Sequence, residues 1–327
     1  MRNVVAWTLA TVVGLAACDT APDAAASAPT DATTSVDATT AVDATTAVDA
    51  PVGATAAREC DAPDACAWIE SYQREVIGRL AGREEVSPGV TLSHRASVAE
   101  RAAARGYLRD ALAARGLDAS LRPYATGQNV VASLPATTGA STARLVVGAH
   151  YDSVAAGPGA ADDGTGVAIV LAAARYLAAL PRRDRPVDFV LFDQEEIGLV
   201  GSTAYAAALT EQGAAVDSVH CFDMVSFDGD GDGAVELWSP SGGLEDLYRL
   251  HGTPRGIPVH AVTFASSDHQ AFLRRGFAAV GVGEEFVGGD HTPHYHRATD
   301  TFDRIDFAYL ARITRLALDV LADRVVD

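Results

Sequence analysis

The sequence predicts an α/β protein of three layers, in which helices cover both faces of a largely parallel, mixed central sheet. From residue 67 to the C-terminus, short apolar runs typical of buried strands alternate with longer segments of helical apolar spacing. Such alternation is typical of sheets built from strand–helix–strand units. Polar segments follow several apolar runs, and sites in α/β sheets lie beyond the carboxyl ends of the strands. We therefore expect the functional site at that edge.

The predicted elements begin with helices at 67–80 and 98–115, the second ended by Gly116. The runs NVVASL and ARLVVGA predict strands at 129–134 and 143–149, and the long Val-, Ala- and Leu-rich segment at 162–180 predicts a helix. Further strands are expected at 186–192, 217–223, 259–264 and 278–282. Further helices are expected at 203–212, 244–251, 269–275 and 307–324.

Residues 1–18 are predicted to be a lipoprotein-type signal peptide. Arg2 is the charged n-region, and the apolar segment at 4–17 is too short to span a bilayer comfortably. The run Leu-Ala-Ala-Cys at 15–18 resembles a bacterial lipoprotein box, in which Cys18 receives lipid and becomes the new N-terminus. We expect an exported bacterial lipoprotein of the cell envelope, attached to the membrane through this lipid only. The alternative is an ordinary cleaved signal, with Cys18 incidental.

Residues 19–57 are predicted to be a disordered linker, and residues 58–327 the functional domain. The linker is rich in Ala, Thr and Asp, repeats VDATTAVDATTAVDA and lacks aromatic residues. The whole chain of 327 residues has a formal net charge of −18, and all 25 of its Lys-or-Arg positions are Arg. This negative charge argues against nucleic acid as a partner.

The cysteines fit an exported protein. Cys60 and Cys66 lie close together at the start of the domain and are candidates for a disulfide. Cys221 lies in a strand-like apolar run and is expected to be a buried free thiol.

Metal-ligating residue types follow four of the predicted strands. The pair Glu195-Glu196 alone would be an ordinary solvated charged turn. Clusters of this kind at several successive strand ends together indicate a metal site instead. His150 and Asp152 point the same way if the strand continues through them. The clusters are His150 and Asp152 with the loop pair Asp162-Asp163, then Glu195-Glu196, then Asp223, and finally His291, His294 and His296.

These clusters resemble the motifs of the co-catalytic zinc aminopeptidases of the M28 peptidase type, in the family's order. The resemblance covers roughly residues 95–319. Its motifs are HYDS at 150–153, PGAADDGTG at 158–166, EEIGLVGS at 195–202, DM at 223–224 and HRATDT at 296–301. It implies a zinc exopeptidase-like fold and a peptide substrate with a free N-terminus.

The resemblance also implies a role for each site residue. Asp162 would bridge two zinc ions, with His150 and Asp223 on one and Glu196 and His296 on the other. Glu195 would act as general base and acid, and Asp152 would orient His150. This set suits two-metal chemistry, in which the ions lie about 3.5–4 Å apart and a carboxylate moves the proton of a metal-activated water.

Two further motifs carry weaker implications. Ser267, Asp268 and His269 resemble the family's S-D-H, which lies near the substrate pocket, but Phe264 stands where members often carry an oxyanion-stabilising Tyr. That role is therefore unassigned.

A separate Asp-Gly repeat places Asp228, Asp230 and Asp232 as in the start of an EF-hand calcium loop. Position twelve is Ser239 where a bidentate Glu is required, so a solvated turn is the alternative to calcium.

Three functions are consistent with these observations. The first is a two-zinc exopeptidase that removes N-terminal residues. The second is a single-zinc glutaminyl cyclase, which retention of both His150 and Asp223 argues against. The third is a metal-free binding domain on the same fold, which would be expected to have lost ligands, and none is lost.

Overall fold

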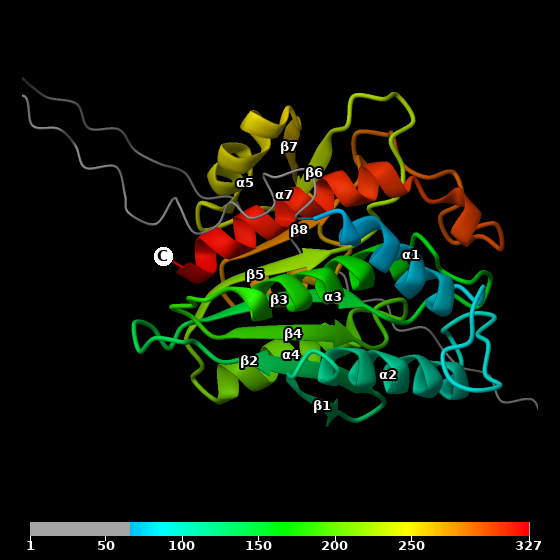
Figure 1. Ribbon diagram of the computed structural model, residues 1–327, viewed down its shortest axis with the longest axis horizontal. Coiled ribbons are helices and arrows are strands. Elements are labelled where there is room, and N and C mark those ends of the chain that lie inside the picture. Colours follow the sequence, from blue (N-terminus) through cyan, green and yellow to red (C-terminus); the bar gives the residue numbers. More distant parts are fainter. Residues whose placement is uncertain (1–65, 327) are drawn as a thin grey trace, which may run out of the picture. The chain divides into compact units, whose positions relative to one another are not determined.

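The structure, a computed structural model, describes residues 66–326 (Figure 1). The chain divides into two units, Met1–Val48 and Asp49–Asp327, and the described residues all belong to the second. The predicted signal peptide with Cys18, the linker and Cys60 lie outside the described residues.

Eight strands form one mixed sheet in the order β1-β2-β4-β3-β5-β8-β6-β7. The first four strands are β1 (Asp118–Pro123), β2 (Gln128–Leu134), β3 (Arg144–His150) and β4 (Val187–Phe192). The others are β5 (Val216–Phe222), β6 (Val235–Trp238), β7 (Val259–Val262) and β8 (Ala279–Gly283). The four neighbours β4, β3, β5 and β8 run parallel, so their carboxyl ends meet at one edge.

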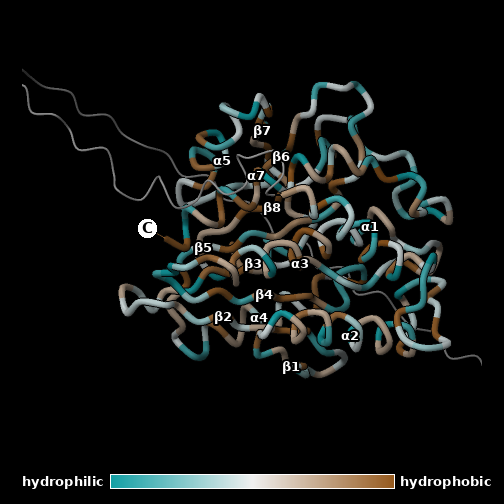
Figure 2. The backbone as a smooth tube through the Cα atoms, viewed as in Figure 1, coloured by the Kyte–Doolittle hydropathy of each residue, from teal (hydrophilic) through white to brown (hydrophobic). Residues whose placement is uncertain are grey.

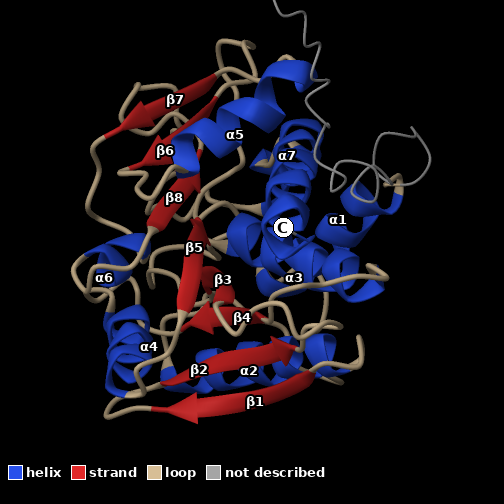
Figure 3. Cartoon of the chain, turned by 90° about the vertical axis from the view of Figure 1, so that its left-hand side faces the viewer, coloured by secondary structure: helices blue, strands red, loops and turns tan. Residues whose placement is uncertain are grey.

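Helices cover both faces of this sheet, as predicted (Figure 3). On one face lie α1 (Trp68–Leu80), α2 (Val98–Ala113), α3 (Gly164–Ala179), α5 (Leu244–Gly252) and α7 (Phe307–Val326). On the other lie α4 (Val200–Glu211) and the short α6 (His269–Leu273). Single turns of 3-10 helix occupy Thr253–Arg255 and Phe302–Arg304. The predicted three-layer α/β fold is confirmed.

The central strands are buried on both faces. Along β3, Leu145, Val147 and Ala149 pack into the core beneath α3, whereas Val146 packs into the core beneath α4 and α6. β4 is buried along its whole length, and Figure 2 shows the hydropathy of the residues along the strands. This double burial explains why the parallel strands read as continuous apolar runs.

Two strands in the structure were not predicted. β1 is a half-exposed edge strand with the sequence DASLRP, and it lacks the apolar alternation by which a strand is recognised. β6 has only four residues, including the charged Glu236. Both pair with longer neighbours, β1 with β2 and β6 with β7 and β8.

The described cysteines agree with the predicted chemistry. Cys66 is buried and disulfide-bonded, and Cys221 is a buried free thiol. Between residues 66 and 326, no helix is long and apolar enough to cross a membrane.

Candidate metal centre

The residues of the predicted site converge at the carboxyl edge of the parallel strands. His150 is the last residue of β3, Glu195 and Glu196 follow β4, and Asp223 directly follows β5. Asp162 comes from the loop between β3 and α3, and His296 from the long segment after β8. Neighbouring parallel strands therefore bring together residues that are up to 146 positions apart, as counted from His150 to His296.

The carboxylate of Asp162 lies between two imidazoles. Its Oδ1 is 3.2 Å from Nε2 of His150, and its Oδ2 is 3.2 Å from Nε2 of His296. Nε2 of His296 is also 3.0 Å from Oε2 of Glu196, and Nε2 of His150 is 3.6 Å from Oδ1 of Asp223. Each oxygen of Asp162 thus faces a different cluster of ligand atoms, an arrangement suited to bridging two cations.

Asp152 contacts both His150 and the Glu195–Glu196 turn. Its carboxylate lies 3.5 Å from Nδ1 of His150, and its carbonyl oxygen lies 3.3 Å from the same nitrogen. The two carboxylate oxygens accept hydrogen bonds from the backbone N–H groups of Glu195, at 3.0 Å, and Glu196, at 3.2 Å. One buried side chain therefore orients the imidazole and fixes the backbone of both glutamates.

The neighbouring Asp163 has a different set of partners. Its Oδ1 accepts hydrogen bonds from the N–H groups of Gly166, at 2.7 Å, and Met224, at 3.3 Å. Its Oδ2 accepts one from the N–H of His150 at 3.3 Å. Asp163 thus caps the start of α3 and joins three segments of the site, so it supports the loop and the helix start.

Two buried residues outside the predicted set hold the Asp162 loop. The carboxylate of Asp300 accepts hydrogen bonds from the N–H groups of Ala161, at 2.7 Å, and Asp162, at 3.2 Å. The guanidinium of the fully buried Arg95 donates to the carbonyl oxygens of Tyr151, Leu80, Pro158 and Gly159. Asp300 stands within the HRATDT motif, which was the available signal; Arg95 had none.

Of the three histidines near the C-terminus, only His296 faces the carboxylates. Nδ1 of His294 lies 2.9 Å from the Thr299 hydroxyl, and the ring of His291 packs against Phe286 at 4.6 Å between ring centroids. The backbone of His296 is left-handed, with φ of 56°.

The donor set fits divalent metal ions. Among residues 66–326, the buried oxygens Oε1 of Glu196 and Oδ1 of Asp223 have no hydrogen-bond donor, and such carboxylate oxygens are costly unless a cation is bound. Burial would raise the pKa of Asp162, but hydrogen bonds from His150 and His296 hold it well below its usual value. Imidazole nitrogens and carboxylate oxygens are the ligands that zinc takes in open catalytic sites.

A cavity of about 440 Å³ opens over these residues. Its lining includes Asp162, Glu195, Glu196, Asp223 and His296. Most of the remaining lining residues are apolar or aromatic, and the lining also includes the polar Ser266 and Arg274; the apolar and aromatic ones are Leu199, Met224, Trp238, Phe264, Ala265, Phe286 and Tyr295. Glu195 and four of the five predicted ligands therefore line one concave, partly apolar site, whereas His150 and Asp152 lie buried behind them.

The predicted pocket residues Ser267, Asp268 and His269 are buried, whereas Ala265 and Ser266 of the same segment line the cavity. Nε2 of His269 lies 2.9 Å from the carbonyl oxygen of Phe264. Burial raises the pKa of Asp268 to about 7. The charge of this carboxylate, after burial, in turn helps to raise the pKa of Glu195. The motif thus lies behind the wall of the cavity.

Tyr295 is a site residue that sequence reasoning missed. Its ring stacks on His296 at 3.8 Å between centroids, and it lines the cavity. Burial and then the carboxylates of Asp162, Asp223, Glu196 and Glu195 raise the pKa of its phenol. The ring lies beside a predicted ligand, at the cavity that the carboxylates line. The available signal was its position next to His296.

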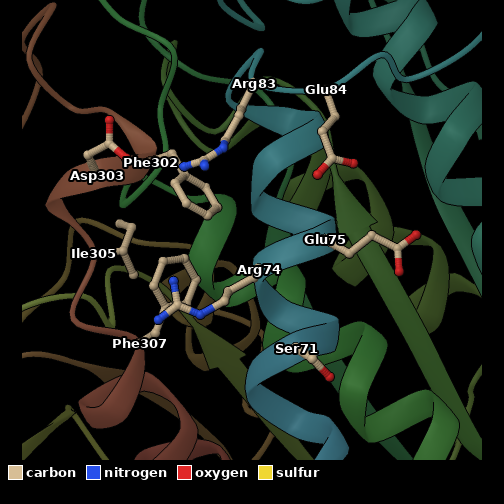
Figure 4. A pocket seen from close by; sticks show the side chains of 9 residues that line it. All are labelled: Ser71, Arg74, Glu75, Arg83, Glu84, Phe302, Asp303, Ile305 and Phe307. Atoms are coloured by element: carbon tan, nitrogen blue, oxygen red, sulfur yellow. Dashed lines mark hydrogen bonds and ion pairs between the residues drawn. The ribbon is translucent and has the colours of Figure 1, made fainter.

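A second cavity, of about 510 Å³, lies between α1 and the segment 302–307 (Figure 4). Its cations are paired within or beside it, because Arg83 contacts Asp303 and Phe302, and Arg74 contacts Glu70 and Phe307. None of the predicted site residues lines it.

The Asp-Gly repeat forms a separate acidic group. Asp228, Asp230 and Asp232 place carboxylate oxygens within 4.8 Å of one another, and Asp230 does so again with Glu285 and Asp290. Carboxylates of the repeat also accept backbone hydrogen bonds within it, for example at Gly233 and Ala234.

The comparisons with known proteins agree with this geometry. Residues 129–321 match peptidase family M28, and this segment contains every predicted ligand. The chain belongs to peptidase family M28, as the motifs predict.

Two curated relatives are similar in sequence. Leucine aminopeptidase 2 of Trichophyton rubrum is 31% identical over 55% of this chain and 41% of its own length. The probable lipoprotein aminopeptidase LpqL of Mycobacterium tuberculosis is 31% identical over 55% of this chain and 42% of its own. The chain thus spans about two fifths of the length of these relatives.

Solved structures share the fold. LapA aminopeptidase of Legionella pneumophila aligns with a TM-score of 0.67 at 20% identity, over 79% of this chain and 75% of LapA. BSAP, a zinc aminopeptidase from Bacillus subtilis, aligns at 0.57 and 25% identity, over 61% and 50%. Glutaminyl cyclase of Porphyromonas gingivalis aligns at 0.65 and 19% identity, over 78% and 98%. Peptidases and a cyclase therefore occur on this fold, so the choice between them rests on the site.

Proposed function

We propose that the protein is an aminopeptidase that hydrolyses N-terminal residues from peptides at a two-zinc centre. The observation that carries the proposal is the carboxylate of Asp162, whose two oxygens face His150 and His296 separately. Asp223 completes the set around His150, and Glu196 the set around His296. Five ligands with one bridge match a pair of cations better than a single ion.

Glu195 is proposed as the general base and acid. Two zinc ions bound here would polarise the scissile carbonyl, lower the pKa of a bound water towards about 7 and lower the pKa of nearby carboxylic acids. Burial raises the pKa of Glu195 to about 10, and two cations beside it would lower this pKa again, so that the carboxylate can accept a proton. It accepts the proton of the attacking water and passes it to the leaving amine.

Tyr295 is proposed as the donor to the developing oxyanion, in place of the Tyr that Phe264 replaces. Tyr295→Phe is expected to lower kcat about 10²–10³-fold, the usual cost of one oxyanion donor, while KM and zinc content stay near those of the parent. Steady-state kinetics with metal analysis tests this, and a kcat within a few-fold of the parent would contradict the assignment. Phe264→Tyr, at another residue that lines the cavity, serves as the matched variant.

The apolar wall suggests the preferred substrates. A side chain placed against Trp238, Phe264 and Phe286 loses apolar surface to water, so bulky apolar N-terminal residues should be favoured. We expect leucyl- and phenylalanyl-p-nitroanilide to be hydrolysed faster than the aspartyl or lysyl compounds, and only with zinc bound. No turnover of any member of the panel by zinc-loaded protein would refute the peptidase proposal.

A peptide with N-terminal Gln and a count of the bound zinc ions distinguish two other functions. A glutaminyl cyclase would convert a peptide with N-terminal Gln into its pyroglutamyl form and bind one zinc, whereas an aminopeptidase would release free Gln and bind two. A binding domain would bind none. The relative LpqL is described as a probable aminopeptidase, which favours the aminopeptidase over the cyclase and the binding domain.

We also propose that a lipid on Cys18 attaches the protein to the membrane. LpqL is described as a lipoprotein, which supports the proposal. Labelled palmitate is expected to be incorporated into the protein in a bacterial host and to be lost from Cys18→Ala. Equal labelling of the two proteins would exclude Cys18 as the acceptor.

Calcium binding at Asp228, Asp230 and Asp232 stays a prediction. If calcium binds, its addition to the zinc-loaded protein is expected to raise Tm, because a ligand that binds only the folded state stabilises it. The shift should disappear in Asp230→Asn. An unchanged Tm in the parent would leave the repeat as a solvated turn.

A further inference from the structure

Glu284 is a fully buried carboxylate that no step of the proposed mechanism uses. It directly follows β8, where the chain enters the segment 284–296 that ends at His296. Buried carboxylates are costly unless donors surround them. The donors around Glu284 therefore indicate what it does.

These donors come from the two loops that carry ligands of different metals. Oε2 of Glu284 accepts hydrogen bonds from both the N–H and the hydroxyl of Ser226, each at 2.8 Å. Oε1 accepts one from the N–H of Thr292 at 2.7 Å. The N–H of Glu284 itself donates to the carbonyl oxygen of Met224 at 2.7 Å. Ser226 and Met224 closely follow Asp223, and Thr292 lies four residues before His296.

We propose that Glu284 is a positioning residue that links the Asp223 loop to the His296 loop, so that one carboxylate places a ligand of each metal. Asp223 belongs to the set around His150, and His296 to the set around Glu196. The spacing of the two sets is therefore fixed by a group that contacts neither ion. This inference rests on the proposed two-metal centre.

The neighbouring strand offers a matched control. Glu236 on β6 is equally buried and pairs in register with Gly283, the residue before Glu284. It accepts hydrogen bonds from the Trp238 indole at 3.0 Å and from the N–H groups of Val287 and Gly288 at 2.9 and 2.6 Å. Val287 and Gly288 lie nine and eight residues before His296, and none of the three donors belongs to the segment that directly follows Asp223, so Glu236 has the same chemistry without the link between the two ligand loops.

The experiment measures zinc affinity by competition with a chromophoric chelator, starting from metal-free protein, together with Tm of the metal-free forms. Glu284→Gln replaces an accepting oxygen with an amide nitrogen, so donors at Ser226 or Thr292 lose their partner. We expect zinc affinity to fall about 10–100-fold, the usual effect of removing a residue that orients metal ligands. Glu236→Gln should lower Tm to a similar extent and keep zinc affinity within about twofold.

If Glu284→Gln keeps the zinc affinity of the parent, as Glu236→Gln should, the proposal is overturned, because both residues would then act on stability alone. If Glu284→Gln does not fold, Ser226→Ala decides the matter, since it removes one hydroxyl donor and leaves the backbone partners; unchanged affinity in that variant also overturns the proposal. A parent protein that binds no zinc would instead refute the proposed function.

Discussion

Glu195→Gln is expected to bind zinc like the parent and to lose about 10²–10⁴-fold in kcat, the range that general acid–base catalysis contributes. The amide preserves the shape of the side chain, and the backbone N–H of residue 195 keeps its hydrogen bond to Asp152. What it loses is the ability to accept a proton from water and return it to the amine. Turnover of leucyl-p-nitroanilide, measured beside zinc content, tests the expectation.

The adjacent glutamate supplies the control. Glu196→Gln removes an oxygen that lies 3.0 Å from Nε2 of His296, so this variant should lose zinc as well as activity. Full activity in Glu195→Gln would remove Glu195 from the mechanism. Loss of zinc in both variants would mean that Glu195 holds a metal and is not the base.

Asp162→Asn is expected to lose most of its bound zinc while remaining folded. A carboxylate offers two accepting oxygens, one facing His150 and one facing His296, whereas an amide offers only one. The variant therefore cannot ligate a cation on each side. The fold should persist because Asp300 still holds the backbone N–H of residue 162. Metal analysis after dialysis and Tm of the metal-free protein check both parts.

Asp163→Asn distinguishes the two neighbours. Its Oδ1 accepts hydrogen bonds from backbone N–H groups at the start of α3 and at Met224, and its Oδ2 accepts one from the N–H of His150. The amide keeps one accepting oxygen and loses the other, so the substitution should lower the stability of the metal-free protein by about 1 kcal/mol, as the loss of one hydrogen bond does. Greater zinc loss in Asp163→Asn than in Asp162→Asn would reverse the proposed roles.

The strand ends explain why so much of the site was predictable. His150, Glu195, Glu196 and Asp223 each follow an apolar run that is buried on both faces, and a buried parallel strand can be recognised from its own residues. Once the strands are parallel neighbours, their carboxyl ends must meet. The family motifs added Asp162 and His296, which lie in loops.

The elements that were missed depend on distant partners. β6 tolerates the buried Glu236 because its carboxylate accepts hydrogen bonds from the N–H groups of Val287 and Gly288. The run VELW itself does not indicate these distant donors. β1 is a half-exposed edge strand that is held by its pairing with β2. Their own residues are too few or too polar to mark them as strands.

The sequence by itself determined the α/β class, most of the strands and, through the motifs, the candidate ligands, because these properties depend on local apolar periodicity and short spacings. Only the tertiary structure decided that Asp162 faces both histidines, that Asp163 is engaged by backbone donors, and that Tyr295 and Glu284 belong to the site. Those facts depend on loops that are separated by 58 residues between Ser226 and Glu284, 61 between Asp163 and Met224, and 134 between Asp162 and His296, and these contacts exist only when the sheet has brought the loops together.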